Sequence, residues 1–124
     1  MLCCGQIAQA DALIDYVDTS ADGKKEIIDI VFNWPVQHLY HTPKVDTKSM
    51  LLGFYINLPR NQGRSWQRPV PFKHEKLLQS IDVYYEKGFN PHLYFEFNAA
   101  VDIEVQPRKD LRGFIIMLSE HENK

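Results

Sequence analysis

An internal repeat constrains the fold of this chain more than any single motif. The stretch EIIDIVFNWPVQHLYHTPKVDTKSMLLGFYINL at 26–58 is echoed by PHLYFEFNAAVDIEVQPRKDLRGFIIMLSE at 91–120. The matches keep their order: Phe32 with Phe97, Asn33 with Asn98, Val36 with Val101, Pro43 with Pro107, Gly53 with Gly113, Phe54 with Phe114, Ile56 with Ile116 and Leu58 with Leu118. Upstream, Ile14 matches Ile81, and the offset shrinks from 67 residues there to 60 at the Gly-Phe pair. Such drift is expected where strands are fixed and loops tolerate deletions. The repeat predicts two related units of about four strands each.

Strand-forming residues dominate the segments between the turns. Tyr, Phe, Val and Ile fill short stretches that Gly, Pro, Asn and Asp separate, a pattern that favours strands over helices. Strands are predicted at 12–18, 26–33, 36–42, 50–58, 80–86, 92–98, 100–106 and 112–119. The segment 59–79 is predicted to be the one long connector, with room for a helical turn at 74–79.

The alternation of apolar residues predicts which side of each strand is buried. Side chains alternate between the two faces of a strand, so residues two apart share a face. The predicted inward rows are Ile28, Ile30 and Phe32; Leu93, Phe95 and Phe97; Phe54, Ile56 and Leu58; Phe114, Ile116 and Leu118; and Ile81, Val83 and Tyr85. Two units that each bury one face predict an all-β fold, a two-sheet β-sandwich.

Length and charge limit the class of protein further. The chain has 124 residues, 44% of them hydrophobic and 24% charged, which fits one domain of the usual ~100–150 residues. The domain is predicted at 12–119, after a disordered or vector-derived N-terminus at 1–11 and before a tail at 120–124. The net charge of -2 and the pI of about 6.2 argue against a nucleic-acid partner, because nucleic-acid-binding proteins usually carry a basic surface.

The chain shows no sign of a membrane segment. No apolar stretch approaches the ~18 residues that a bilayer crossing needs. The start, MLCCGQIAQADA, lacks the charged and apolar regions of a secretory signal, so the protein is either cytoplasmic or has lost a signal. Cys3 and Cys4 are adjacent near the start and cannot staple the core. A lipid-anchor site there is disfavoured because only Met1 and Leu2 precede it.

A series of strand motifs runs in order through the chain. An apolar strand leads to FNWPV, HTP and a Gly-Phe strand, and after the connector come VYYE, LYFEF and DLRGFIIML. From about residue 12 to 119, this order resembles AMIN-type domains of bacterial envelope proteins. The resemblance implies two related sheets in a sandwich, attached to cell-wall amidases, pilus secretins or repeat-containing envelope proteins. It implies a non-catalytic role, in which the domain localises its attached machinery in the periplasm by contacting peptidoglycan or another envelope component. The Cys-Cys start departs from the family.

His38 and His41 are candidates for metal or acid-base chemistry. Three residues apart on a regular strand, they face opposite sides. The repeat aligns His38 with Ile103, an inward position, and His41 with Gln106. We therefore expect a half-buried His38, an outward His41 and no metal site, since a joint site would need a bulge.

The connector holds the most distinctive chemistry of the chain. Arg60, Arg64 and Arg68 surround Trp66 in RNQGRSWQRP. Guanidinium forks match carboxylates and phosphates, and an indole plane stacks on the apolar face of a sugar. These four residues are the candidate ligand-binding site. In the alternative, Trp66 covers the sandwich edge and the arginines remain solvated.

The predicted outward rows are more apolar than a free sheet face requires. Apolar patches of this kind often mark a partner site. The candidate partner surface comprises Val31, Tyr55, Tyr84, Tyr94, Ile115 and Met117. The connector or the N-terminal segment covering these residues is an equally good interpretation.

No motif indicates catalysis. The chain shows no nucleophile beside a base, no carboxylate pair in a cleft and no Gly-rich phosphate loop. Neither enzymatic activity nor a cofactor is expected. The leading hypothesis is a periplasmic binding or localisation module, part of a larger protein, that contacts peptidoglycan or an envelope protein. The alternative is a protein-protein adaptor that acts through the tyrosine-rich face or an edge strand. A third hypothesis is a hydrolase that uses the histidines in its active site.

Overall fold

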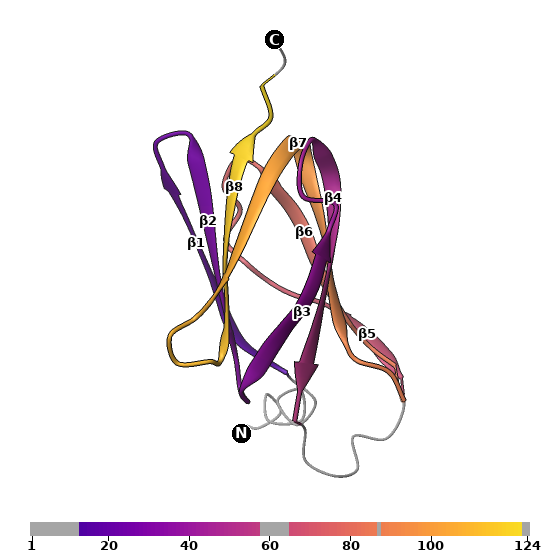
Figure 1. The fold of residues 1–124 in the computed structure, drawn as a ribbon. Helices are drawn as coiled ribbons and strands as arrows, with labels where there is room; N and C mark the ends of the chain where they lie inside the picture. Colours follow the sequence, from indigo (N-terminus) through magenta and orange to yellow (C-terminus); the bar gives the residue numbers. More distant parts are fainter. Residues whose placement is uncertain (1–12, 58–64, 87, 123–124) are drawn as a thin grey trace, which may run out of the picture.

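The computed structural model describes residues 13–57, 65–86 and 88–122, and these residues form strands and no helix. The predicted disorder of 1–11 lies outside the described residues. The strands are β1 (Ile14–Asp22), β2 (Lys25–Phe32), β3 (Val36–Thr42), β4 (Thr47–Ile56), β5 (Trp66–Pro69), β6 (Leu78–Tyr85), β7 (His92–Pro107) and β8 (Gly113–Glu120) (Figure 1). All of their pairings are antiparallel. The all-β prediction is confirmed.

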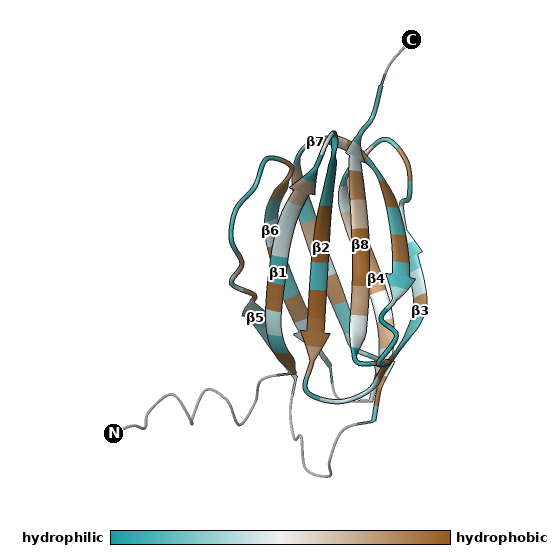
Figure 2. Ribbon diagram, turned by 90° about the vertical axis from the view of Figure 1, so that its left-hand side faces the viewer, coloured by the Kyte–Doolittle hydropathy of each residue, from teal (hydrophilic) through white to brown (hydrophobic). Residues whose placement is uncertain are grey.

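The strands form one hydrogen-bonded sheet in the order β1-β2-β8-β7-β4-β3, with β6 also pairing to β7 and β5 to β6. The long strand β7 joins two halves of this sheet. Its first part pairs with β4 and β6, and its second part pairs with β8. We call the strands β1, β2, β8 and the second part of β7 the front half, which faces the viewer in Figure 2, and the others the back half. The segments predicted as separate strands at 92–98 and 100–106 are therefore one strand that changes partners, as strands do at sandwich corners.

Both halves contribute to one hydrophobic core. The fully buried side chains include Ile28, Ile30 and Phe32 of β2, Phe114, Ile116 and Leu118 of β8, Met50, Leu52 and Phe54 of β4, and Leu93 and Phe95 of β7. Phe32, Phe54 and Phe114 lie in mutual ring contact, with centroids 4.9–6.1 Å apart. Because the inward rows of both halves meet in one cluster, the two halves face each other across the core. Of the predicted inward positions, Tyr85 is only half-buried, and Leu58 lies outside the described residues.

The topology carries the internal repeat. In the repeat, β1 corresponds to β6, β2 to the first part of β7, β3 to its second part and β4 to β8. When each strand is exchanged with its counterpart, the front order β1-β2-β8-β7 becomes β6-β7-β4-β3, which is the order of the back half. The register differs from the sequence match, however. Ile28 lies opposite Ile116, and its counterpart Leu93 lies opposite Leu52. Ile116 therefore corresponds to Leu52, and not to Ile56. A four-residue slip escapes detection in the sequence because it keeps every side chain on the same face.

A buried carboxylate shapes the end of the connector. Glu26 of β2 lies on the core side, 2% exposed. Its Oε1 accepts hydrogen bonds from the backbone N–H groups of Lys76 (3.0 Å) and Leu77 (2.7 Å), and its Oε2 accepts one from Leu78 (3.0 Å). The helical turn allowed at 74–79 is absent, because these N–H groups point at Glu26 and β6 begins at Leu78.

Candidate functional site

The outer face of the back half carries a group of aromatic rings from four strands. One cross-strand row runs through Tyr40, Gly53, His92, Tyr84 and Gln67, and each of these residues lies directly opposite the next. A second row runs through Leu51, Tyr94, Asp82 and Pro69. Tyr55 extends the face beside the first row, opposite Gln37. We call Tyr40, Tyr55, Tyr84, His92 and Tyr94 the aromatic face.

Contacts with neighbouring residues hold rings of this face in position. Gly53 leaves room for the Tyr40 ring, since a Cβ at that glycine would lie 2.5 Å from the ring. Tyr84 and His92 are stacked, with centroids 4.8 Å apart and planes inclined by 13°. Tyr40 and Tyr55 remain 48% exposed each. The face therefore presents ring surfaces that are held in place and still open to a ligand.

The polar groups of the face are few and mostly acidic or neutral. Asp82 lies opposite Tyr94, and Glu96 accepts a hydrogen bond from the Ser80 hydroxyl at 3.2 Å. Burial lowers the pKa of His92, although nearby Glu86 acts in the opposite direction, so the ring stacked on Tyr84 is neutral at pH 7. Flat rings beside hydroxyl and carboxylate groups can pack against the C–H face of a sugar while hydrogen-bonding its hydroxyl groups.

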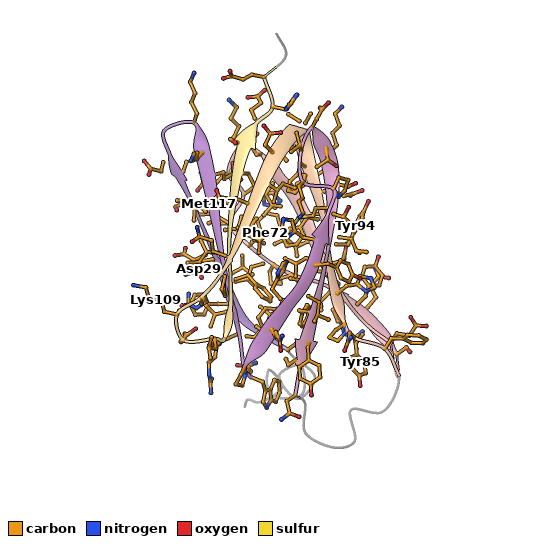
Figure 3. The ribbon with its side chains drawn as sticks, in the orientation of Figure 1. Asp29, Phe72, Tyr85, Tyr94, Lys109 and Met117 are labelled. Atoms are coloured by element: carbon orange, nitrogen blue, oxygen red, sulfur yellow. The ribbon has the colours of Figure 1, made fainter. Side chains whose placement is uncertain are left out.

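The six residues predicted as one partner surface lie on two opposite faces. Tyr55, Tyr84 and Tyr94 belong to the aromatic face. Val31, Ile115 and Met117 lie on the outer side of the front half, where Val31 is only 7% exposed. Figure 3 shows Met117 and Tyr94 on opposite sides of the domain. The prediction of one surface is wrong because the strands of each repeat unit are divided between the two halves.

The connector site falls largely outside the described residues. Arg60 and Arg64 lie there, so their role stays a prediction. The backbone of Trp66 pairs in β5 with Tyr85, which is labelled in Figure 3. Arg68 is exposed, and it alternates with Gln67 along β5 and so faces away from the aromatic face. In β5, Gln67 and Pro69 continue the two cross-strand rows of this face.

The two histidines of β3 lie together, contrary to the sequence prediction. The pairing register shifts between His38 and Tyr40, so Leu39 is an extra residue in a bulge. His38 then lies opposite Phe54 and His41 opposite Leu52, and both partners belong to the core row. His38 Nε2 and His41 Nδ1 are 3.0 Å apart. The half-buried position predicted for His38 is confirmed, and the outward position predicted for His41 is wrong because the bulge reverses the alternation after Leu39.

These histidines should make stability depend on pH. Burial, together with Lys44, lowers the pKa of both His38 and His41 from the ordinary 6.5, and His38 itself further lowers that of His41. A lowered folded-state pKa stabilises the fold above pH 6.5, and this contribution is lost as the pH falls toward the folded value. His121 acts in the opposite direction, because its hydrogen bond to Asp102 raises its pKa and favours the folded state at acid pH.

A His41→Gln variant should lose less unfolding free energy than the parent when the pH is lowered from 7.5 to 5.5. Urea unfolding at pH 7.5 and pH 5.5 would measure the difference in unfolding free energy. His121→Gln is the matched control and should show a larger loss of stability on acidification than the parent. Equal pH dependence in the parent and the His41 variant would contradict the assignment.

Sequence reasoning missed Tyr40 and His92 as members of the aromatic face. Tyr40 was obscured by the bulge, which sets its side chain outward over Gly53. His92 had a detectable signal, because it lies two residues before Tyr94 and so shares its side of the strand.

Other candidate features lie away from this face. A groove of about 410 Å³ at one end of the domain is lined by charges of both signs, including Lys24, Lys25, Lys76 and Glu120. In the ranges that the structure describes, no group of three or more His, Cys, Asp or Glu side chains is placed to hold a metal ion. The same ranges contain no helix of the length and hydropathy needed to span a membrane.

The fold and the site together define an all-β domain with an aromatic sheet face. No known family model, curated protein sequence or solved structure matches the chain. The likeness to AMIN-type domains therefore rests on the strand motifs alone.

Proposed function

We propose that this chain is a non-catalytic binding module that localises a bacterial cell-envelope protein by contacting peptidoglycan through the aromatic face. The observation that carries the proposal is the gathering of five rings on one outer face, two of them about half exposed. Large rings with a polar tip dominate binding surfaces because they bury much area at little conformational cost. In this proposal the domain lies in the periplasm as part of a larger protein.

The chemistry of the face supports a glycan rather than an anionic ligand. Peptidoglycan strands are chains of amino-sugar rings, each of which presents an apolar C–H face and hydroxyl or amide edges. The rings of Tyr40 and Tyr55 supply planes that can pack against the C–H face. The tyrosine hydroxyls and Asp82 supply hydrogen-bond partners for the hydroxyl and amide edges. The described part of this face carries no arginine or lysine in its two cross-strand rows, whereas a phosphate-binding site would need such charges.

A second candidate function is a protein-protein adaptor that uses the same face. The exposure of Tyr40 and Tyr55 on neighbouring strands favours it, because tyrosine is enriched among the residues that dominate protein interfaces. The partner would then be another envelope protein, and binding would not require the glycan.

Sedimentation with purified sacculi separates the two functions. The parent domain is expected to pellet with sacculi across a salt series, because ring stacking is insensitive to salt. Replacing Tyr55 by alanine should weaken binding about tenfold, the equivalent of ~1.4 kcal/mol, and a Tyr40→Ala, Tyr55→Ala double variant should abolish it.

The matched control is Tyr16→Ala on the front half. Tyr16 is 50% exposed, close to the 48% of Tyr55, but lies on β1, opposite Val31. Its replacement should leave pelleting unchanged. If the parent fails to pellet at every salt concentration, the peptidoglycan function is rejected. Loss of an envelope-protein partner in the Tyr40, Tyr55 variant would then favour the adaptor.

A further inference from the structure

The bulge in β3 brings two imidazoles into a chelating arrangement. Leu39 is the extra residue, and because of it His38 and His41 project from the same side of an edge strand. His38 Nε2 and His41 Nδ1 are 3.0 Å apart, and the ring planes are inclined by 49°. Both side chains are half-buried, and the His38 ring also lies edge-on to Phe114 at 6.1 Å. The pair is therefore supported by the core on one side and open to solvent on the other.

The separation of the two nitrogens is the separation that a metal ion imposes. A divalent late transition metal binds imidazole nitrogen at about 2.0–2.1 Å. Two such bonds at an angle of 90–109° place the nitrogens about 2.8–3.4 Å apart. The 3.0 Å between His38 Nε2 and His41 Nδ1 lies within this range, so the two nitrogens already have the spacing that a shared metal ion needs.

The protonation state is also suitable. Metal ligation needs the neutral ring, and burial together with Lys44 lowers the pKa of both histidines, so both are neutral at pH 7. Without metal, the N–H of one ring donates a hydrogen bond to the nitrogen lone pair of the other. With metal, both facing nitrogens use their lone pairs, and each ring keeps its one proton on the nitrogen that faces away. The exchange is a change of tautomer, with no net release of protons.

We propose that His38 and His41 form a two-histidine chelate for a late divalent transition metal, with Cu²⁺ bound more tightly than Zn²⁺. The order follows the intrinsic preference of nitrogen ligands. No third His, Cys, Asp or Glu joins the pair in the ranges that the structure describes, so water fills the remaining positions. Lys44 is the charged group that bears on both rings, and its positive charge limits the affinity. Binding would fix the bulge that sets Tyr40 outward.

The test is a Cu²⁺ titration of the full chain, free of any affinity tag, with Cys3 and Cys4 replaced by serine so that thiols do not compete. Calorimetry should show one site, and electron paramagnetic resonance should show coupling to two imidazole nitrogens. His38→Gln and His41→Gln should each weaken binding at least tenfold, and the double variant should be little worse than either single variant, as expected of a chelate. Lys44→Gln should tighten it. His74→Gln is the control and should bind as the parent does.

A second measurement needs no variant at the site. In the nuclear magnetic resonance spectrum of the chain, trace Cu²⁺ should broaden the ring protons of His38 and His41 before those of the other histidines. Undiminished binding in both single variants, or broadening centred on another histidine or on the N-terminus, would overturn the proposal. So would the absence of any binding at millimolar Cu²⁺ in the folded parent.

Discussion

Replacing Glu26 by alanine is expected to lower the unfolding free energy of the domain by about 3–5 kcal/mol. The carboxylate accepts three backbone hydrogen bonds, and those from Leu77 and Leu78 are buried. Each buried N–H left without an acceptor costs about 1–3 kcal/mol. Because Glu26 also lines the groove at the end of the domain, water can reach part of the vacated space, and this relief keeps the expected loss below the sum of the three bonds.

Urea unfolding followed by circular dichroism would measure the effect. Glu26→Gln should cost less than Glu26→Ala, since the amide oxygen still accepts while its NH₂ group opposes one N–H donor. Glu104→Ala is the matched control, because that glutamate is exposed on β7 and its loss should change stability by no more than ~0.5 kcal/mol. An unfolding midpoint for Glu26→Ala equal to that of Glu104→Ala would contradict the proposed role of the carboxylate.

Replacing Gly113 by alanine is expected to lower the unfolding free energy about as much as replacing Glu26 does. A Cβ there would lie 1.8 Å from the carbonyl oxygen of Ile30 and 2.9 Å from the Arg108 side chain. The carbonyl belongs to the neighbouring strand β2, whose register with β8 places Val31 opposite Gly113. Backbone cannot move aside as a side chain can, so Gly113→Ala should force the β2 and β8 strands apart. We expect a loss of more than about 3 kcal/mol, beyond the usual range for overpacking.

Gly53→Ala provides the comparison for this prediction. There the clash is with the Tyr40 ring, which can swing toward solvent, so the fold should lose about 1 kcal/mol or less. Thermal unfolding of the parent and the two glycine variants would measure the loss of stability in each. If the Gly113→Ala variant were as stable as the Gly53→Ala variant, β2 and β8 would not approach each other closely enough at Gly113 to exclude a methyl group.

The strands were predictable because their signal is local. Apolar alternation and turn residues identified the positions of most strands, and the inward rows of β2, β7 and β8 match the buried residues. The exceptions depend on contacts between distant segments. The short strand β5 exists through its pairing with β6, and the bend at Lys76 and Leu77 exists through Glu26, fifty or more residues away in sequence.

The candidate site was predictable only in part, for a related reason. Tyr55, Tyr84 and Tyr94 could be placed outward from alternation alone, but which outer residues share a face depends on how the strands divide between the two halves. The bulge at Leu39 changed the direction of two side chains at once, setting Tyr40 outward and His41 inward. A single extra residue in a strand leaves no mark in the period-two pattern on either side of it.

In the proposed function, the aromatic face binds glycan strands. The most direct test is a titration of isotope-labelled domain with soluble peptidoglycan fragments, followed by backbone amide shifts. We expect the shifted amides to cluster at Tyr40, Tyr55, Tyr84, His92 and Tyr94, while those of Tyr16 and Met117 on the front half stay unchanged. Shifts centred on the front half, or none at millimolar fragment, would contradict it.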